Sequence, residues 1–205
     1  MILVMTATIQ MPSEFVVGEW PRPYKWTRDE YHRLADLGLF AGHRVQLIDG
    51  EIIEMSPQGS PHYVALTLAT RALEAAFGAG YWVRPQGPLS LSKHSEPEPD
   101  VSVVKGSPRI AIGHPATAEL VVEVSDTSLS FDLGPKSRLY AGTGILDYWV
   151  LDLQGRKLIV HRQPVADAAA PLGHRYADVR TLGPTDSIAP LSKPDAVVQI
   201  ADLLP

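Results

Sequence analysis

Two segments dense in valine constrain the fold of this chain most strongly. Residues 101–104 read VSVV, and residues 120–124 read LVVEV. Such runs are typical of strands in the middle of a sheet, where β-branched side chains pack well on both faces. Glu123 places a carboxylate inside the second run. A buried carboxylate is costly unless it is paired or bound to a metal, so we expect Glu123 to have a partner or a function.

Helices and further strands are predicted on both sides of these two segments. Thr27 and Glu30 have the spacing of a capping box, which predicts the start of a helix. Asp49-Gly50 lies between two apolar runs and predicts a β-hairpin over residues 45–53. The other predicted elements are helices over 60–77 and near 136–141, the latter capped by Asp132, and strands at 81–84, 89–91, 146–153, 157–161 and near 174–179. This order predicts an α/β (α+β) fold.

The chain has the length and composition of one domain. It has 205 residues, of which 45% are apolar and 20% are charged. Residues 1–23 hold three prolines and no clear period, so we interpret them as an arm whose apolar start is not a signal peptide. We expect one domain over residues 24–205, with extra C-terminal strands from about residue 163. No apolar run approaches the ~18 residues that span a membrane.

Cysteine usage and charge limit the chemistry further. The sequence has no cysteine, which excludes disulfides, zinc–thiolate sites and thiol nucleophiles and fits a cytoplasmic protein. The net charge is −5, which counts against tight sequence-independent binding of nucleic acid. Contact with DNA would therefore depend on a local basic patch, for which the candidates are Arg84, Lys93, Lys105 and Arg138.

Asp100 is the second acidic residue that suggests chemistry. It follows Pro99 and opens the first valine-rich strand. If the two strands are neighbours, Asp100 and Glu123 converge at one end of the sheet, and a divalent cation would relieve their repulsion. Oxygen ligands of this kind suit Mg²⁺ or Mn²⁺. Lys136, thirteen residues after Glu123, could orient or help deprotonate a water, or stabilise charge on a phosphate.

Each of these residues also has an ordinary explanation. From spacing alone, Asp100 could be a turn residue at the start of a strand, and Lys136 a surface lysine of a helix. Glu123 is harder to explain in that way, because a glutamate inside a valine run needs a partner. Hydrolysis of glycosides by the carboxylate pair needs only Asp100 and Glu123, but it gives Lys136 no role and ranks low.

Together these motifs resemble a known superfamily. Pro99-Asp100 followed by Glu123-Val124-Ser125 resembles the signature of the PD-(D/E)XK, or restriction-endonuclease-like, nucleases. Ser125 stands in the usual lysine position, and Lys136 resembles the relocated lysine of some members. Over about residues 24–165 the chain resembles a bacterial family of uncharacterised restriction endonucleases, through residues 47–52 (LIDGEI), Ser56-Pro57, His62, 98–104 (EPDVSVV), 123–125 (EVS), Asp132, Lys136, Tyr140 and 144–152 (GILDYWVLD).

The resemblance implies a restriction-endonuclease-like core, with a mixed central sheet flanked by helices. It implies a homodimeric, metal-dependent endonuclease that hydrolyses phosphodiester bonds in DNA. Asp100, Glu123 and Lys136 would be catalytic, and Mg²⁺ or Mn²⁺ would be held by Asp100, Glu123 and the backbone carbonyl of Val124.

One departure from the family pattern keeps a second function open. Gln46 stands where members of the family usually carry glutamate, so it brings no charge to the metal site. The alternative is a catalytically weakened nuclease-fold module that binds nucleic acid or a protein partner. The candidate residues lining the site are Gln46, Glu51, His62 and Ser125. Of these, Glu51 is more simply a solvated hairpin residue, and His62 could equally be a capping or solvent-facing residue at a helix start.

Overall fold

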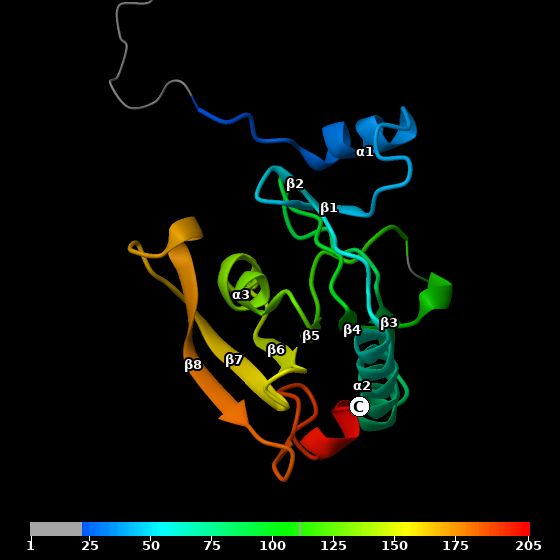
Figure 1. Cartoon of the computed structure of the whole chain (residues 1–205), viewed down its shortest axis with the longest axis vertical. Helices are drawn as coiled ribbons and strands as arrows, with labels where there is room; N and C mark the ends of the chain where they lie inside the picture. Colours follow the sequence, from blue (N-terminus) through cyan, green and yellow to red (C-terminus); the bar gives the residue numbers. More distant parts are fainter. Residues whose placement is uncertain (1–21, 111) are drawn as a thin grey trace, which may run out of the picture.

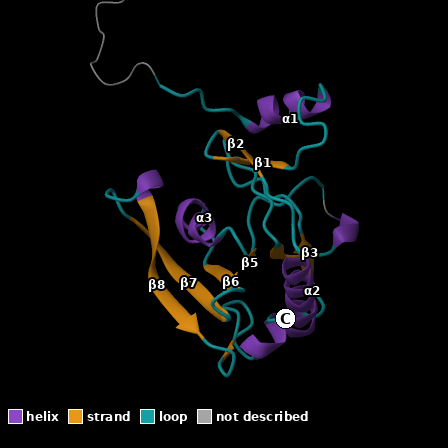
Figure 2. Ribbon diagram, in the orientation of Figure 1, coloured by secondary structure: helices purple, strands orange, loops and turns teal. Residues whose placement is uncertain are grey.

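A computed structural model describes residues 22–110 and 112–205 of the chain (Figure 1). The arm predicted over residues 1–23 lies almost wholly outside the described residues. The rest forms a central sheet covered by helices on its two faces, with a small lobe at one end (Figure 2). No helix in the described ranges is long and apolar enough to cross a membrane.

The sheet has six strands in the order β3-β4-β5-β6-β7-β8. The strands are β3 (Tyr81–Pro85), β4 (Val101–Lys105), β5 (Leu120–Ser125), β6 (Asp147–Asp152), β7 (Lys157–Ala166) and β8 (His174–Leu182). β5 and β6 are parallel and the other neighbours are antiparallel, so the sheet is mixed, as predicted. The two valine-rich segments are the adjacent central strands β4 and β5.

Both faces of the sheet are covered. Helix α2 (Ser60–Phe77) and the C-terminal 3-10 turn η4 (Ile200–Leu203) pack on the face formed by the even-numbered residues of β5. Helix α4 (Ser137–Gly142) packs on the opposite face, which carries Val121. Because side chains alternate along a strand, Glu123 points to the same face as Val121 and α4.

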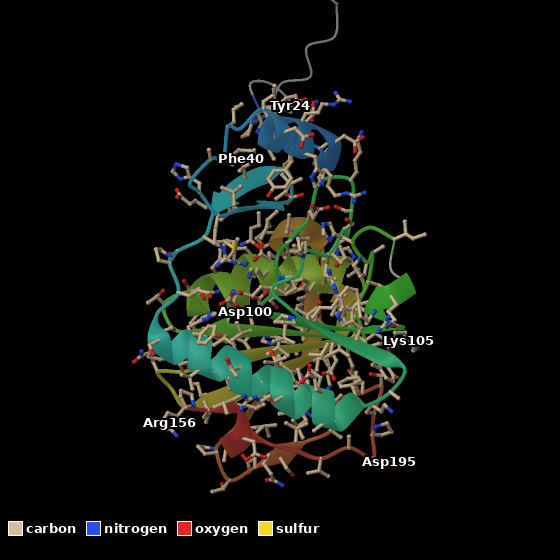
Figure 3. All side chains as sticks on the ribbon, turned by 90° about the vertical axis from the view of Figure 1, so that its right-hand side faces the viewer. Tyr24, Phe40, Asp100, Lys105, Arg156 and Asp195 are labelled. Atoms are coloured by element: carbon tan, nitrogen blue, oxygen red, sulfur yellow. The ribbon has the colours of Figure 1, made fainter. Side chains whose placement is uncertain are left out.

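A small lobe precedes the sheet. It holds α1 (Arg28–Asp36), which starts with the predicted capping box of Thr27 and Glu30, and the predicted hairpin of β1 (Val45–Ile48) and β2 (Glu51–Glu54). Figure 3 shows Asp100 between this lobe and α2. The remaining short elements are the 3-10 turns η1 (Pro108–Ile110) and η3 (Pro171–Gly173) and the strand pair β9 (Ser187–Ile188) and β10 (Val198–Gln199).

Two predicted elements differ in the structure. Residues 89–91 form no strand, because this segment makes an irregular contact in which the Leu89 amide donates to the Pro97 carbonyl (2.9 Å). The helix predicted near 136–141 begins earlier, as α3 (Leu129–Phe131) followed by a π-helical turn, η2 (Asp132–Lys136). Asp132 is therefore inside this helical segment and is not its N-cap. β7 also continues across residue 163 without a break.

Candidate active site

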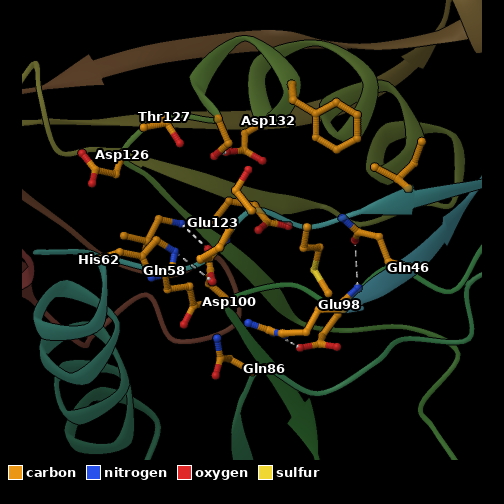
Figure 4. Close-up of a pocket in the computed structure, with 18 of the residues that line it drawn as sticks. Gln46, Gln58, His62, Gln86, Glu98, Asp100, Glu123, Asp126, Thr127 and Asp132 are labelled. Carbon is orange, nitrogen blue, oxygen red and sulfur yellow. Dashed lines mark hydrogen bonds and ion pairs between the residues drawn. The ribbon is translucent and has the colours of Figure 1, made fainter. Parts of the chain in front are cut away.

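A cavity of about 360 Å³ opens beside the point where β4 begins and β5 ends. Its wall includes Asp100, Glu123, Val124 and Lys136, so the structure brings together the predicted catalytic and metal-binding residues. Figure 4 shows the labelled acidic side chains Asp100, Glu123 and Asp132 turned towards a common space.

Strand pairing explains why Asp100 meets β5. The ladder between β4 and β5 ends at the pair Val101 and Val122. Just beyond this pair, the Asp100 side chain replaces the β4 backbone as the hydrogen-bond partner of β5. Asp100 Oδ2 accepts a hydrogen bond from the amide of Val124 at 2.8 Å. The N–H and C=O of one strand residue point to the same edge, so the Val124 carbonyl also faces the side where β4 has ended.

Glu123 is held in a buried ion pair. Lys136 Nζ lies 2.8 Å from Glu123 Oε2 and 3.7 Å from Asp132 Oδ1. The Tyr140 hydroxyl donates to Glu123 Oε1 at 2.7 Å. Glu123 is 1% exposed and Lys136 is 6% exposed, so water contributes little to either charge. The partner that the sequence required for Glu123 is Lys136.

Burial and charge oppose each other in this pair. Burial raises the pKa of the Glu123 carboxyl above its ordinary value, and the charge of the Lys136 ammonium opposes that rise. Burial would lower the pKa of Lys136, but the carboxylates of Glu123, Asp132 and Asp100 outweigh it and raise the pKa above its ordinary value. Lys136 therefore keeps its proton, and we interpret the 2.8 Å contact as an ion pair between an ammonium and a carboxylate.

The π-helical turn places Lys136. Pro135 lies inside η2, where it cannot donate the backbone hydrogen bond of a regular helix. Single π-helical turns of this kind are frequent at functional sites. Asp132, at the start of the turn, accepts hydrogen bonds from the hydroxyls of Ser125 (2.6 Å) and Ser128 (2.5 Å). Ser125 thus supports Asp132, and it is absent from the described wall of the cavity.

The wall also contains His62, near the start of α2. Its Nε2 lies 3.2 Å from Asp100 Oδ1. Burial lowers the pKa of the His62 ring, but the hydrogen bond and the charge of Asp100 outweigh that effect and raise the pKa. The side chains of His62 and Asp100 face the cavity as a pair. His62 thus lines the cavity, which is one of the two positions that the sequence left open for it.

Comparison with known proteins identifies the family. Over residues 28–199 the chain matches the Uma2 family, described as "Putative restriction endonuclease". The chain belongs to the Uma2 family. This confirms the resemblance seen in the motifs and supports a nuclease as the general class.

The fold of this Uma2 chain is similar to that of a solved structure. That structure is the crystal structure of "a putative nuclease belonging to DUF820" from Anabaena variabilis ATCC 29413, at 14% sequence identity and a TM-score of 0.63. The match covers 86% of this chain and 96% of the other. At this identity the likeness establishes the fold, and with it the predicted mixed sheet flanked by helices. No curated protein matches the sequence.

Gln46 and Glu51, two of the candidate lining residues, lie at different positions relative to the cavity. Gln46 is buried in the wall, and its amide oxygen accepts a hydrogen bond from the backbone N–H of Glu98 at 3.2 Å. Glu51, by contrast, is exposed at the start of β2 and is absent from the described wall. Glu51 is therefore the solvated hairpin residue of the two explanations offered for it.

The four basic residues expected to contact DNA form no patch at the site. Arg84 is buried under the turn after β3, and Lys105 forms an ion pair with Glu119. Lys93 and Arg138 lie on separate parts of the chain, and none of the four belongs to the described wall of the cavity. The cavity has Arg44 instead, which the sequence analysis missed and which pairs with Glu98 at 2.5 Å.

The donor atoms of the wall fit a divalent cation. Asp100, Glu123 and the Val124 carbonyl offer oxygen ligands, which Mg²⁺ and Mn²⁺ prefer. In the described part of the chain, no three or more Asp, Glu or His side chains are arranged to hold a metal. The protein would therefore supply part of a coordination shell. This matches Mg²⁺, which keeps waters and uses one or two carboxylates together with substrate phosphates.

Proposed function

We propose that this Uma2-family protein is a metal-dependent endonuclease that hydrolyses phosphodiester bonds in DNA. The observation that carries the proposal is the buried pair of Glu123 and Lys136, facing the same cavity as Asp100. Replacing a buried ion pair by apolar residues of similar size is often neutral or stabilising. Stability alone therefore gives little reason to keep these charges inside the protein, whereas phosphodiester chemistry does.

The residues divide the work between binding and charge stabilisation. Asp100, Glu123 and the Val124 carbonyl would hold Mg²⁺ or Mn²⁺. When bound, the ion would polarise the phosphate and lower the pKa of a water molecule. Lys136 keeps its proton because the surrounding carboxylates raise its pKa. Its role is therefore to stabilise negative charge that develops on the phosphate, and not to take the proton from water.

Asp132 and Tyr140 hold these groups in place. The Tyr140 hydroxyl fixes one oxygen of Glu123, and Lys136 fixes the other. Asp132 is fixed by two serine hydroxyls and lies one turn before Lys136. Catalytic groups that are held in this way need no rearrangement when charge develops in the transition state.

Cleavage of supercoiled plasmid and of a labelled single strand, in Mg²⁺ or Mn²⁺, tests the proposal. Lys136→Met is expected to cut about 10²–10³-fold more slowly than wild type, the usual effect of losing one charge-stabilising donor. Lys136→Arg keeps the charge but not the shape of the donor, and is expected to lose about tenfold while staying folded. Lys105→Met, on the exposed end of β4, serves as the control. Equal cleavage by wild type and both Lys136 variants would contradict the proposal.

The second candidate is a nuclease-fold module that binds DNA or a protein partner without cutting. Gln46 favours it, because this residue brings no charge and its amide oxygen already accepts a hydrogen bond from Glu98. In that case wild type and Lys136→Arg would bind labelled DNA equally and cut none. The homodimer expected from the sequence is a separate prediction, and sedimentation of the purified protein tests it.

A further inference from the structure

The turn after β3 has features that the proposed chemistry does not use. Gln86 lines the same cavity as Asp100 and has a φ of 51°. This is the left-handed region, which residues other than glycine seldom adopt. Strained backbone of this kind persists only where the surrounding structure enforces it, and it is frequent at ligand-binding sites.

The surroundings of Gln86 do enforce its position. The backbone N–H of Gln86 donates to the Asp100 carbonyl at 2.9 Å, and this bond holds the turn against the start of β4. Beneath the turn, the buried Arg84 guanidinium donates to the Pro88 carbonyl at 3.2 Å. A Cβ at Gly87 would come within 2.8 Å of that guanidinium, so glycine lets the chain pass over Arg84 without displacing it. The Gln86 side chain is thus held next to Asp100.

Two polar atoms in this cavity are buried without a partner. Among the described residues, neither Gln86 Nε2 nor His62 Nδ1 has a hydrogen-bond partner. Figure 4 shows the Gln86 amide nitrogen directed towards Asp100, with no interaction drawn to it. A buried donor without an acceptor costs free energy. An acceptor group of a ligand in the cavity would remove that cost.

The basic side chains of the wall are already paired. Arg44 pairs with Glu98, His62 with Asp100, and Lys136 with Glu123. These pairs leave the wall little attraction for the phosphates of either duplex or single-stranded DNA, so recognition must come from contacts to a base. Phe131 adds an aromatic ring to the wall, and aromatic rings stack on unpaired bases. A volume of about 360 Å³ is in the range of pockets for ligands the size of a nucleotide.

We propose that the cavity takes one unpaired nucleotide of a single-stranded DNA segment, with the Gln86 carboxamide donating a hydrogen bond to it and Phe131 stacking on its base. This inference rests on the proposed function, because it names the substrate class of the same site. The Gln86 donor contacts the nucleotide and adds affinity for the single strand. Duplex DNA lacks an unpaired base to enter the cavity.

Fluorescence anisotropy of a short labelled strand, alone and as a blunt duplex, tests the inference. Ca²⁺ replaces Mg²⁺ in the assay, because it takes oxygen ligands and allows binding to be read separately from cleavage. Wild type is expected to bind the single strand about tenfold more tightly than the duplex. Gln86→Met and Phe131→Leu are each expected to weaken single-strand binding about tenfold, the order of loss expected for one hydrogen bond or one stacked base.

Gln163→Met is the matched control. Gln163 is an exposed glutamine on β7 with a φ of 59°, so the same substitution meets the same backbone strain outside the cavity. If Gln86→Met unfolds, Gln86→Asn tolerates the left-handed backbone and shortens the reach of the amide, with the same expected loss. Equal or tighter binding of the duplex, or Gln86 variants that bind like Gln163→Met, would overturn the inference. If wild type binds the single strand but cuts neither DNA in Mg²⁺, the proposed function fails, while the binding of an unpaired nucleotide in this cavity is still supported.

Discussion

At the scale of single residues, the pairing of Glu123 with Lys136 has a measurable cost when it is broken. Lys136→Met would leave a carboxylate that is 1% exposed without its counter-charge. Removing one partner of a buried pair typically costs about 3–5 kcal/mol of unfolding free energy. Adding Glu123→Gln removes the second charge, and Tyr140 can still donate to the new amide oxygen. Urea unfolding of the double variant is expected to recover most of the loss.

The double-mutant cycle also shows how to recognise failure. If the losses of Lys136→Met and Glu123→Gln simply add, the two charges do not interact, and the central ion pair of the site is wrong. Groups in direct contact normally show a coupling energy of about 0.5–3 kcal/mol. Tyr140→Phe is a useful third variant, because it removes one hydrogen bond to Glu123 and leaves the charges in place.

Some site residues could be predicted from the sequence and others could not. Glu123 stood out because a carboxylate inside a valine run must be paired. Asp132 was predicted to cap a helix. Its actual partners, two serine hydroxyls, could not be predicted, because they come together only when the segment folds. Gln86 gave no signal beyond a turn between two prolines. Its left-handed backbone and unpaired amide exist only in three dimensions.

At the scale of elements, β7 carries a histidine that makes stability depend on pH. His161 is buried between Tyr148 of β6 and Tyr176 of β8, and burial lowers its pKa to about 4. In the unfolded chain a histidine titrates near ~6.5. As the pH falls from about 6.5 to about 4, the unfolded state takes up a proton that the folded state refuses, so stability is lost in this window.

His161→Phe isolates this effect, because a phenyl ring suits the aromatic surroundings and does not titrate. Between pH 7 and pH 5, wild type is expected to lose roughly 2 kcal/mol more unfolding free energy than the variant. Urea unfolding at the two pH values measures the difference. The same pH dependence in both proteins would show that His161 is charged or exposed in the folded state.

The elements were predicted best where their sequence pattern was local. The capping box, the Asp-Gly hairpin and the long helix over residues 60–77 all match the structure, because each depends on neighbours in the chain. Residues 89–91 were predicted to form a strand, but the backbone N–H of Leu89 donates to the carbonyl of Pro97, which lies in an irregular segment. The helix containing Lys136 begins earlier than predicted. A proline such as Pro135 usually marks a helix boundary, but here it lies inside a π-helical turn.

At the scale of the whole molecule, the site depends on how the sheet is ordered. Antiparallel pairing of β4 with β5 brings Asp100 beside Val124, and the crossover helix between the parallel strands β5 and β6 carries Lys136. The lobe and α2 add Gln46 and His62 from far earlier in the chain. Asp100 and Glu123 were expected to converge only if their two strands were neighbours. The sequence alone could not show that the strands are neighbours.

The most direct test of a metal centre is thermal stabilisation by Mn²⁺ or Mg²⁺. A ligand present at ~100 times its Kd adds about 2.7 kcal/mol to the folded state. For a chain of this size that is a rise in Tm of roughly 5–10 °C. The controls are Asp202→Asn and Glu74→Gln, which change exposed carboxylates outside the cavity. Wild type and both controls are expected to show the rise, and Asp100→Asn and Glu123→Gln to lose it. An equal rise in all five proteins, or none in wild type, would contradict a metal site at Asp100 and Glu123.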